Sequence, residues 1–194
     1  MRITGGAWRS RRLGSPAKNM PVRPTPDAMR ERVFAVLGEL VTGARFLDLF
    51  AGTGAVGLEA LSRGASSVVF VERHRGAARI LRDNCALFDL EDGRARTLVQ
   101  PAAAAVAALA RRGEAFDLAW ADPPFESWED GLAALSGAFS AGLLESDAVA
   151  CLECPERAAV EEGLPDHLEA FRDLKGGASR VVLIRRLNVG TLNV

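Results

Sequence analysis

The chain has few of the residues that build metal or redox centres. Its 194 residues include 3 cysteines and 2 histidines. Cys151 and Cys154 form one Cys-x-x-Cys pair, and the sequence holds no second pair to complete a four-ligand zinc site. If a strand predicted at residues 148–152 continues to Cys154, the odd spacing places the two thiols on opposite faces of the sheet. We therefore predict no metal site and unpaired thiols in a reducing compartment.

Long apolar segments are also missing. No run approaches 18 apolar residues, and the N-terminus lacks the apolar stretch of a signal peptide. We therefore expect neither export nor a membrane partner, and we predict a cytoplasmic protein. A length of 194 residues is typical of one domain, so a second large domain is not expected.

Net charge is nearly absent too, but the charges are unevenly distributed. The formal net charge of −1, taken alone, argues against a nucleic-acid partner. Residues 1–32 carry eight basic and two acidic side chains, a balance of +6, while the other 16 basic and 23 acidic residues give −7. This asymmetry predicts a basic arm for an anionic partner. We expect the arm, with a short hairpin, at residues 1–25 and a single domain at residues 26–194.

Beyond the arm, strand and helix patterns alternate. After a helix at residues 27–37, strands are predicted at 46–50, 67–71, 96–99, 116–121 and 148–152, with helices between them at 55–62, 75–88, 102–111 and 128–139. The alternation predicts an α/β fold whose mostly parallel sheet has helices on both faces. Two further strands, at 167–173 and 180–184, predict a hairpin that adds an antiparallel closing strand to a seven-stranded sheet.

A glycine-rich turn follows the first predicted strand. Glycines 52, 54 and 57 match G-x-G-x-x-G, a turn that brings backbone N–H groups and a helix N-terminus close to a ligand. Glu72 ends the next strand, where a carboxylate can bind the ribose hydroxyls of a nucleoside cofactor. Asp48 would repel a pyrophosphate but suits a cationic cofactor such as S-adenosylmethionine. An NAD site and a purely capping role for Asp48 remain alternatives.

The tetrapeptide Asp122-Pro-Pro-Phe125 follows the fourth predicted strand, at the edge where open α/β sheets bind ligands. The Asp122 carboxylate and the Pro123 carbonyl can accept the two N–H bonds of an exocyclic amine and aim its nitrogen at a methyl donor. Pro123 and Pro124 stiffen the loop, and Phe125 offers a face on which an extruded base can stack. These residues predict methyl transfer to the exocyclic amine of a nucleobase.

The chain resembles the RsmD family of bacterial 16S rRNA guanine-N2 methyltransferases. Beside the two motifs, the similar stretches are residues 2–13, 23–31, 47–65 and 177–183, together with Asn84. The resemblance implies a Rossmann-like class I methyltransferase fold with S-adenosylmethionine as cofactor. It also implies a guanine N2 amine of 16S rRNA, within the 30S subunit, as the target. We expect the protein to act as a monomer.

The predicted site residues form three groups. The catalytic group is Asp122, Pro123, Pro124 and Phe125. The cofactor group is Asp48, Phe50, Gly52, Thr53, Gly54, Glu72, Arg73 and Gln100, the last because Pro101 stands where related enzymes often have an Asp or Asn beside the adenine. The RNA-binding group, which combines guanidinium groups with an aromatic ring, is Arg2, Trp8, Arg9, Arg11, Arg12, Arg23 and Arg30. Trp8 could instead anchor the arm in the core, and Arg30 could order it by ion pairing.

Three other functions stay open. A DNA adenine-N6 methyltransferase would use the same motifs, but such enzymes usually carry an added recognition domain. An NAD oxidoreductase would use the glycine turn but leave residues 122–125 without a task. A non-enzymatic RNA-binding assembly factor would keep the arm and need no cofactor.

Overall fold

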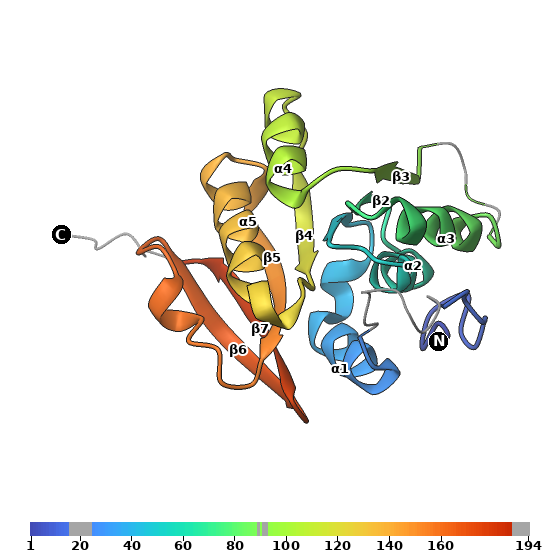
Figure 1. Cartoon of the computed structure of the whole chain (residues 1–194), viewed down its shortest axis with the longest axis horizontal. Coiled ribbons are helices and arrows are strands. Elements are labelled where there is room, and N and C mark those ends of the chain that lie inside the picture. Colours follow the sequence, from blue (N-terminus) through green and yellow to red (C-terminus); the bar gives the residue numbers. More distant parts are fainter. Residues whose placement is uncertain (16–24, 89, 91–92, 188–194) are drawn as a thin grey trace.

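The structure is a computed structural model that describes residues 1–15, 25–88, 90 and 93–187. Within them, seven strands form one sheet in the order β3-β2-β1-β4-β5-β7-β6 (Figure 1). The strands are β1 Arg45–Leu49, β2 Ser67–Val71, β3 Ala95–Leu98, β4 Phe116–Ala121, β5 Leu144–Pro155, β6 Leu168–Gly176 and β7 Ser179–Arg186.

The first five strands are parallel to one another, and β7 is antiparallel to both β5 and β6. The predicted α/β fold with a closing hairpin is therefore confirmed. β5 is much longer than predicted because its ends pair with different neighbours. Leu144 pairs with Phe116 of β4, whereas Pro155 pairs with Ser179 of β7.

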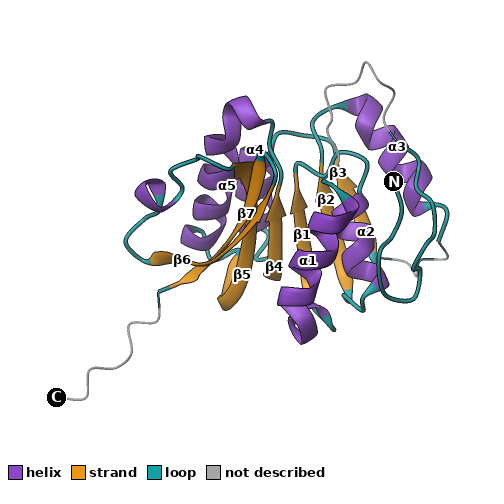
Figure 2. Ribbon diagram, turned by 90° about the horizontal axis from the view of Figure 1, so that it is seen from below, coloured by secondary structure: helices purple, strands orange, loops and turns teal. Residues whose placement is uncertain are grey.

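Helices cover both faces of the sheet (Figure 2). The helices are α1 Asp27–Leu37, α2 Ala55–Ser62, α3 Arg75–Cys85, α4 Ala102–Arg111 and α5 Trp128–Ser140, with short 3₁₀ helices η1 Gly38–Val41, η2 Phe125–Ser127 and η3 Glu161–Gly163. Helices α4 and α5 pack on one face, and α1, α2 and α3 lie on the other. Among the described residues, none of these helices is long and apolar enough to cross a membrane.

Alternation along the strands divides the core between the two faces. Leu47 and Leu49 of β1 pack toward α4 and α5, while Phe46 packs toward α1 and α2. The same alternation separates the two thiols of the Cys-x-x-Cys pair. Cys151 and Cys154 are both buried and free but belong to opposite core layers, as the spacing predicts.

The first 14 residues form a short hairpin that packs against the domain. Arg2 and Arg12 form an antiparallel bridge, and the Ile3 N–H donates to the Arg11 carbonyl at 3.0 Å. Ile3 and Leu13 are buried in the same core layer as α1 and α2. The predicted hairpin is present, but it is docked onto the domain and shares its core instead of extending away from it.

Candidate active site

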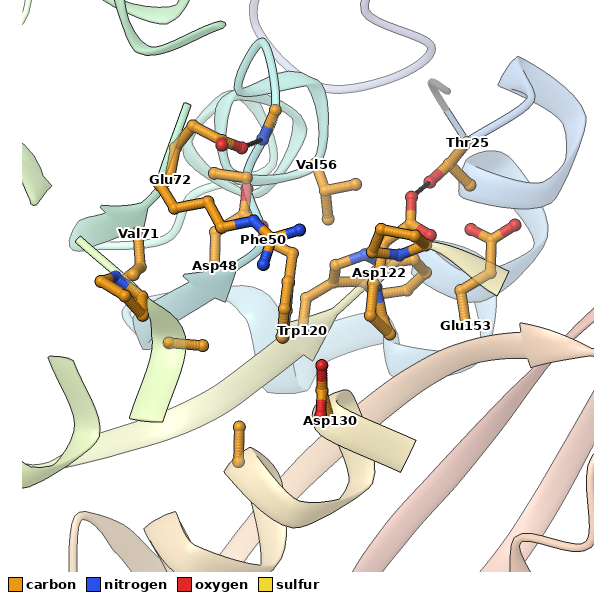
Figure 3. A pocket seen from close by; sticks show the side chains of 18 of the residues that line it. Thr25, Asp48, Phe50, Val56, Val71, Glu72, Trp120, Asp122, Asp130 and Glu153 are labelled. Carbon is orange, nitrogen blue, oxygen red and sulfur yellow. Dashed lines mark hydrogen bonds between the residues drawn. The ribbon is translucent and has the colours of Figure 1, made fainter. Parts of the chain in front are cut away.

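A cavity of about 1140 Å³ lies at the carboxyl edge of the parallel strands (Figure 3). The turn after β1, the segments after β2 and β3, and the loop after β4 line it, together with Thr25, Pro26 and Glu153. All four predicted catalytic residues and all but one of the predicted cofactor residues are in its wall. The exception is Gly54, which does not line the cavity. The cofactor contact at Gly54 therefore stays a prediction from the sequence.

The glycine turn has a backbone that other residues would rarely adopt. Phe50, Gly52 and Gly54 have φ angles of +63°, +56° and +83°. Gly54 is the N-cap of α2, and a Cβ added there would lie 3.0 Å from Leu81. Gly57 permits a close approach of helix to sheet, because an added Cβ would lie 2.3 Å from the Phe70 ring. The turn thus exposes Gly52 to the cavity, while Gly54 and Gly57 shape the turn and the packing behind it.

Asp48 is buried near the end of β1, and the protein provides a hydrogen bond to only one of its two carboxylate oxygens among the described atoms. Its Oδ2 accepts a hydrogen bond of 2.9 Å from the Gly57 N–H in the first turn of α2. Its Oδ1 is buried with no hydrogen-bond partner among the described atoms. Burial raises the pKa of Asp48 to about 8. The capping role is therefore real, but it uses one oxygen only, and the carboxyl group also lines the cavity.

Glu72 is held at the cavity wall by backbone donors on two sides. One carboxylate oxygen accepts from the Gly52 N–H at 2.7 Å (Figure 3). The other accepts from the His74 N–H, also at 2.7 Å. These bonds fix the side chain, which is 5% exposed, against the glycine turn. A carboxylate has about four lone-pair positions, so it can still accept hydroxyl donors.

The segment after β3 forms an apolar wall of the same cavity. Gln100, Pro101 and Ala102 line it beside Val71 at the end of β2. Thr53 lines it from the glycine turn, and the Thr53 carbonyl accepts a bond of 2.9 Å from the Asn84 side chain on α3. This wall is mostly apolar, and Gln100 is a polar residue within it.

The loop after β4 presents the Asp122 carboxylate to the cavity. The Thr25 hydroxyl donates to Asp122 Oδ2 at 3.1 Å, so the N-terminal segment touches this carboxylate directly (Figure 3). Pro123 is buried against α5, where a Cβ added at Gly131 would lie 2.7 Å from the proline ring. Phe125 is half-buried at the start of η2 and lines the cavity. The loop is thus fixed both by its prolines and by Thr25.

Two residues that the sequence analysis assigned to no site role also line this cavity. Trp120 of β4 is 1% exposed, and its indole N–H is buried without a hydrogen-bond partner among the described atoms. Glu153 of β5 is 4% exposed. The signal for Glu153 was available, because a carboxylate interrupts the otherwise apolar strand segment at residues 148–154. No cluster of three or more side chains suited to a metal ion occurs in the described part of the chain.

A further buried carboxylate, Glu59 on α2, clamps the hairpin to the domain. It accepts from the Thr4 N–H, the Thr4 hydroxyl and the Gly5 N–H at 2.7–2.8 Å, and from Arg63 Nε at 2.9 Å. Arg30 Nε lies 3.9 Å from it. Glu59 was not among the predicted site residues, although a charge inside the apolar helix Ala55–Ser62 is a visible signal.

The clamp corrects the prediction that Arg30 binds RNA. Arg30 is fully buried, and its guanidinium donates to the carbonyls of Thr25 and Arg2 and to Asp27. Because no part of the side chain reaches solvent, Arg30 orders the N-terminal segment by ion pairing, the alternative that sequence analysis left open.

The other predicted RNA contacts differ in exposure. Arg2, Arg9, Arg11 and Arg12 are exposed on the hairpin. Trp8 is half-buried and stacks on Phe88 with ring centroids 4.2 Å apart, which makes it an anchor of the hairpin. Arg23 lies outside the described residues.

The fold and the cavity together define the class of protein. The chain has the Rossmann-like fold of class I methyltransferases, as two solved structures indicate. A putative methyltransferase of Escherichia coli, yhhF, has a TM-score of 0.77 and 32% identity, covering 96% of this chain and 97% of the other. A putative methylase of Haemophilus influenzae has a TM-score of 0.75 and 26% identity, covering 96% and 98%.

Sequence comparison then identifies the family. The model of the family described as Conserved hypothetical protein 95 matches residues 1–185, and the chain belongs to this family, the RsmD family. A relative from Escherichia coli K12, "Ribosomal RNA small subunit methyltransferase D", is 40% identical over 126 residues, which is 64% of this chain and 60% of the relative. The match thus spans less than two thirds of that relative. "Putative rRNA methyltransferase YlbH" of Bacillus subtilis is 36% identical, over 65% and 67%.

Proposed function

We propose that the protein transfers a methyl group from S-adenosylmethionine to the N2 amine of a guanine in 16S rRNA. The observation that carries the proposal is the single cavity shared by the half-bonded Asp48 and the Asp122–Phe125 loop. The names of the family relatives, which include a small-subunit rRNA methyltransferase, support the RNA target. In an oxidoreductase Asp122 would have no role in the reaction. A non-enzymatic assembly factor would need no such cavity.

The residues around the glycine turn fit S-adenosylmethionine. The unpartnered Asp48 oxygen suits a positively charged group, and it disfavours the pyrophosphate of NAD. Glu72 is held where ribose hydroxyls can donate to it, and the wall at Gln100 suits the adenine. When bound, S-adenosylmethionine supplies an electrophilic methyl group on a sulfonium whose sulfur leaves as a neutral thioether.

The Asp122–Phe125 loop would position the guanine. The Asp122 carboxylate and the Pro123 carbonyl accept the N–H bonds of the N2 amine, which directs the nitrogen lone pair toward the methyl carbon. Phe125 stacks on the extruded base. As the new N–C bond forms, the nitrogen becomes acidic and its proton passes to Asp122 or to water. No strong general base is required.

The hairpin would bind the RNA backbone. Arg9 and Arg12 are exposed, and Arg11 donates to the Leu87 carbonyl and lies over the Phe88 ring, so part of its guanidinium serves the hairpin itself. We propose that these cations contact phosphates of the small ribosomal subunit in the cytoplasm.

The test is methyl transfer from radiolabelled S-adenosylmethionine to unmodified 30S subunits, free 16S rRNA and duplex DNA. We expect label in a guanine of the 30S subunits, and none after Asp122→Ala, although Asp122→Ala should still bind the RNA. Label in DNA adenine alone would replace the proposal with a DNA methyltransferase. Retention of NAD with no binding of S-adenosylmethionine would end it.

A further inference from the structure

Glu153 is a buried carboxylate in the cavity wall that the reaction proposed above does not use. It lies on β5 and is 4% exposed, between the fully buried Leu152 and Cys154. A carboxylate at a cavity wall can accept hydrogen bonds from the donors of a bound group. The position of Glu153 in the sheet indicates which group this would be.

The sheet places Glu153 beside the residue that would hold the target amine. Strands β4 and β5 run parallel, and Ala121 pairs with Leu152. Asp122 and Glu153 are the next residues along these two neighbouring strands, and both line the cavity (Figure 3). A flat group bound at Asp122 would therefore present its adjacent edge to Glu153.

The edge of guanine beside the N2 amine carries a second donor, the N1–H. Adenine and cytosine, the other bases with exocyclic amines, instead carry a ring-nitrogen acceptor beside the amine. A carboxylate only accepts hydrogen bonds. It would therefore attract the N1–H of guanine and repel the ring-nitrogen lone pair of adenine or cytosine. In a water-excluded site that repulsion is not relieved by solvent.

We infer that Glu153 is the residue that selects guanine, accepting the N1–H while Asp122 holds the N2 amine. The inference rests on the proposed function, because it presupposes a guanine in the cavity. It assigns specificity to two neighbouring carboxylates, one directly after β4 and one near the end of β5. The aromatic face of Phe125 would stack on any base and adds no preference.

The first experiment changes the substrate and leaves the protein intact. Reconstituted 30S particles would carry 2-aminopurine at the mapped target position, which keeps the 2-amine but has an acceptor at N1. We expect kcat/KM of the wild-type enzyme to fall about 10- to 100-fold, the range for losing one hydrogen bond to a charged group. Equal rates on the two bases would overturn the inference without any mutation.

The second experiment attributes the preference to Glu153. The amide of Glu153→Gln can turn to accept the N1–H of guanine or to donate to the N1 of 2-aminopurine. We expect the preference for guanine to shrink at least 10-fold, while affinity for S-adenosylmethionine is unchanged. Glu156→Gln, exposed near the end of the same strand, is the matched control and should keep the full preference.

The outcomes separate the two proposals. If the wild-type enzyme labels no guanine of the small subunit, the proposed function fails and the inference fails with it. If it labels guanine but Glu153→Gln keeps the wild-type preference, only the role of Glu153 is overturned. If Glu153→Gln does not fold, the wild-type comparison between guanine and 2-aminopurine decides alone.

Discussion

Two buried carboxylates lie at the short helix α2 and differ in how their hydrogen bonds are completed: Glu59 belongs to the helix, and Asp48 accepts a bond from its first turn. Glu59 is fully buried, and both of its oxygens accept hydrogen bonds, from Thr4, Gly5 and Arg63. Asp48 is 1% exposed, and one of its oxygens accepts a single bond from the Gly57 N–H. Its other oxygen accepts none from the described atoms.

The difference separates a structural carboxylate from one kept for a ligand. Buried polar atoms are nearly always paired, because an unpaired one costs free energy that folding must offset elsewhere. The protein itself completes the bonding of Glu59, and two arginines compensate its charge. No arginine or lysine among the described residues forms an ion pair with Asp48, and burial raises its pKa to about 8. A cationic ligand would complete its bonding.

The largest expected effect comes from removing the charge of Glu59. In Glu59→Gln the buried Arg30 loses one of its two carboxylate partners and keeps only the partly exposed Asp27, and the hairpin loses a charged acceptor of its backbone N–H groups. Breaking a buried pair on one side typically costs about 3–5 kcal/mol. We expect the free energy of unfolding in urea to fall by that amount, with early proteolysis of residues 1–14.

The control for Glu59→Gln is a glutamate without these bonds. Glu156→Gln, on the surface, should change the unfolding free energy by less than about 0.5 kcal/mol. A Glu59→Gln variant as stable as wild type would show that the clamp does not hold the hairpin.

The opposite result is expected for Asp48. Asp48→Asn keeps an acceptor for the Gly57 N–H and removes only the ability to carry a negative charge, so we expect little loss of stability. Affinity for S-adenosylmethionine should fall about 10- to 100-fold, since a hydrogen bond to a charged group contributes ~1.5–3 kcal/mol. Isothermal titration calorimetry measures both affinities. A large loss of stability with unchanged affinity would place Asp48 with Glu59 among the structural carboxylates.

The pKa of Asp48 adds a prediction about pH. Below about pH 8 the free protein holds a proton on Asp48, and a cationic cofactor favours the ionised form, so binding must release that proton. Affinity should therefore rise with pH, by at most about tenfold per pH unit, and level off above about pH 8. Asp48→Asn should lack this component. A wild-type profile parallel to that of the Asn variant would exclude Asp48 as the titrating group.

The same contrast shows what could be predicted from the sequence. The alternation between helical and strand patterns of apolar residues predicts α2, β2, α4 and β4 with the same bounds as in the structure. Each of these elements buries an apolar face or run that its own residues define. The bounds of β5 were not predicted correctly. The residues beyond the predicted strand 148–152 belong to β5 because they pair with β4 at one end and with β7 at the other, and no local sequence pattern indicates such pairing.

For the candidate site, the sequence motifs predicted which segments line one cavity. They did not predict the contacts between residues that are far apart in the sequence. Glycine φ angles and the edge position of Asp122 follow from local chemistry. The burial of Arg30, the clamp at Glu59 and the bond between Thr25 and Asp122 join residues up to 97 positions apart. Arg30 lies in a basic segment of the sequence and was therefore predicted to contact RNA. In the folded domain it lies next to the Glu59 carboxylate instead.

Thr25 connects the Glu59 cluster to the catalytic loop at Asp122. Its substitution gives the smallest effect that we expect. Its carbonyl accepts from Arg30, which the Glu59 cluster holds, and its hydroxyl donates to Asp122 Oδ2 at 3.1 Å. We expect Thr25→Val, which keeps the shape and removes the donor, to lower kcat about 5- to 10-fold because Asp122 loses its fixed orientation. Thr25→Ser should restore the rate, and affinity for S-adenosylmethionine should be unchanged in both. Equal kcat values for Thr25→Val and wild type would mean that the clamp orders the N-terminal segment without orienting the catalytic carboxylate.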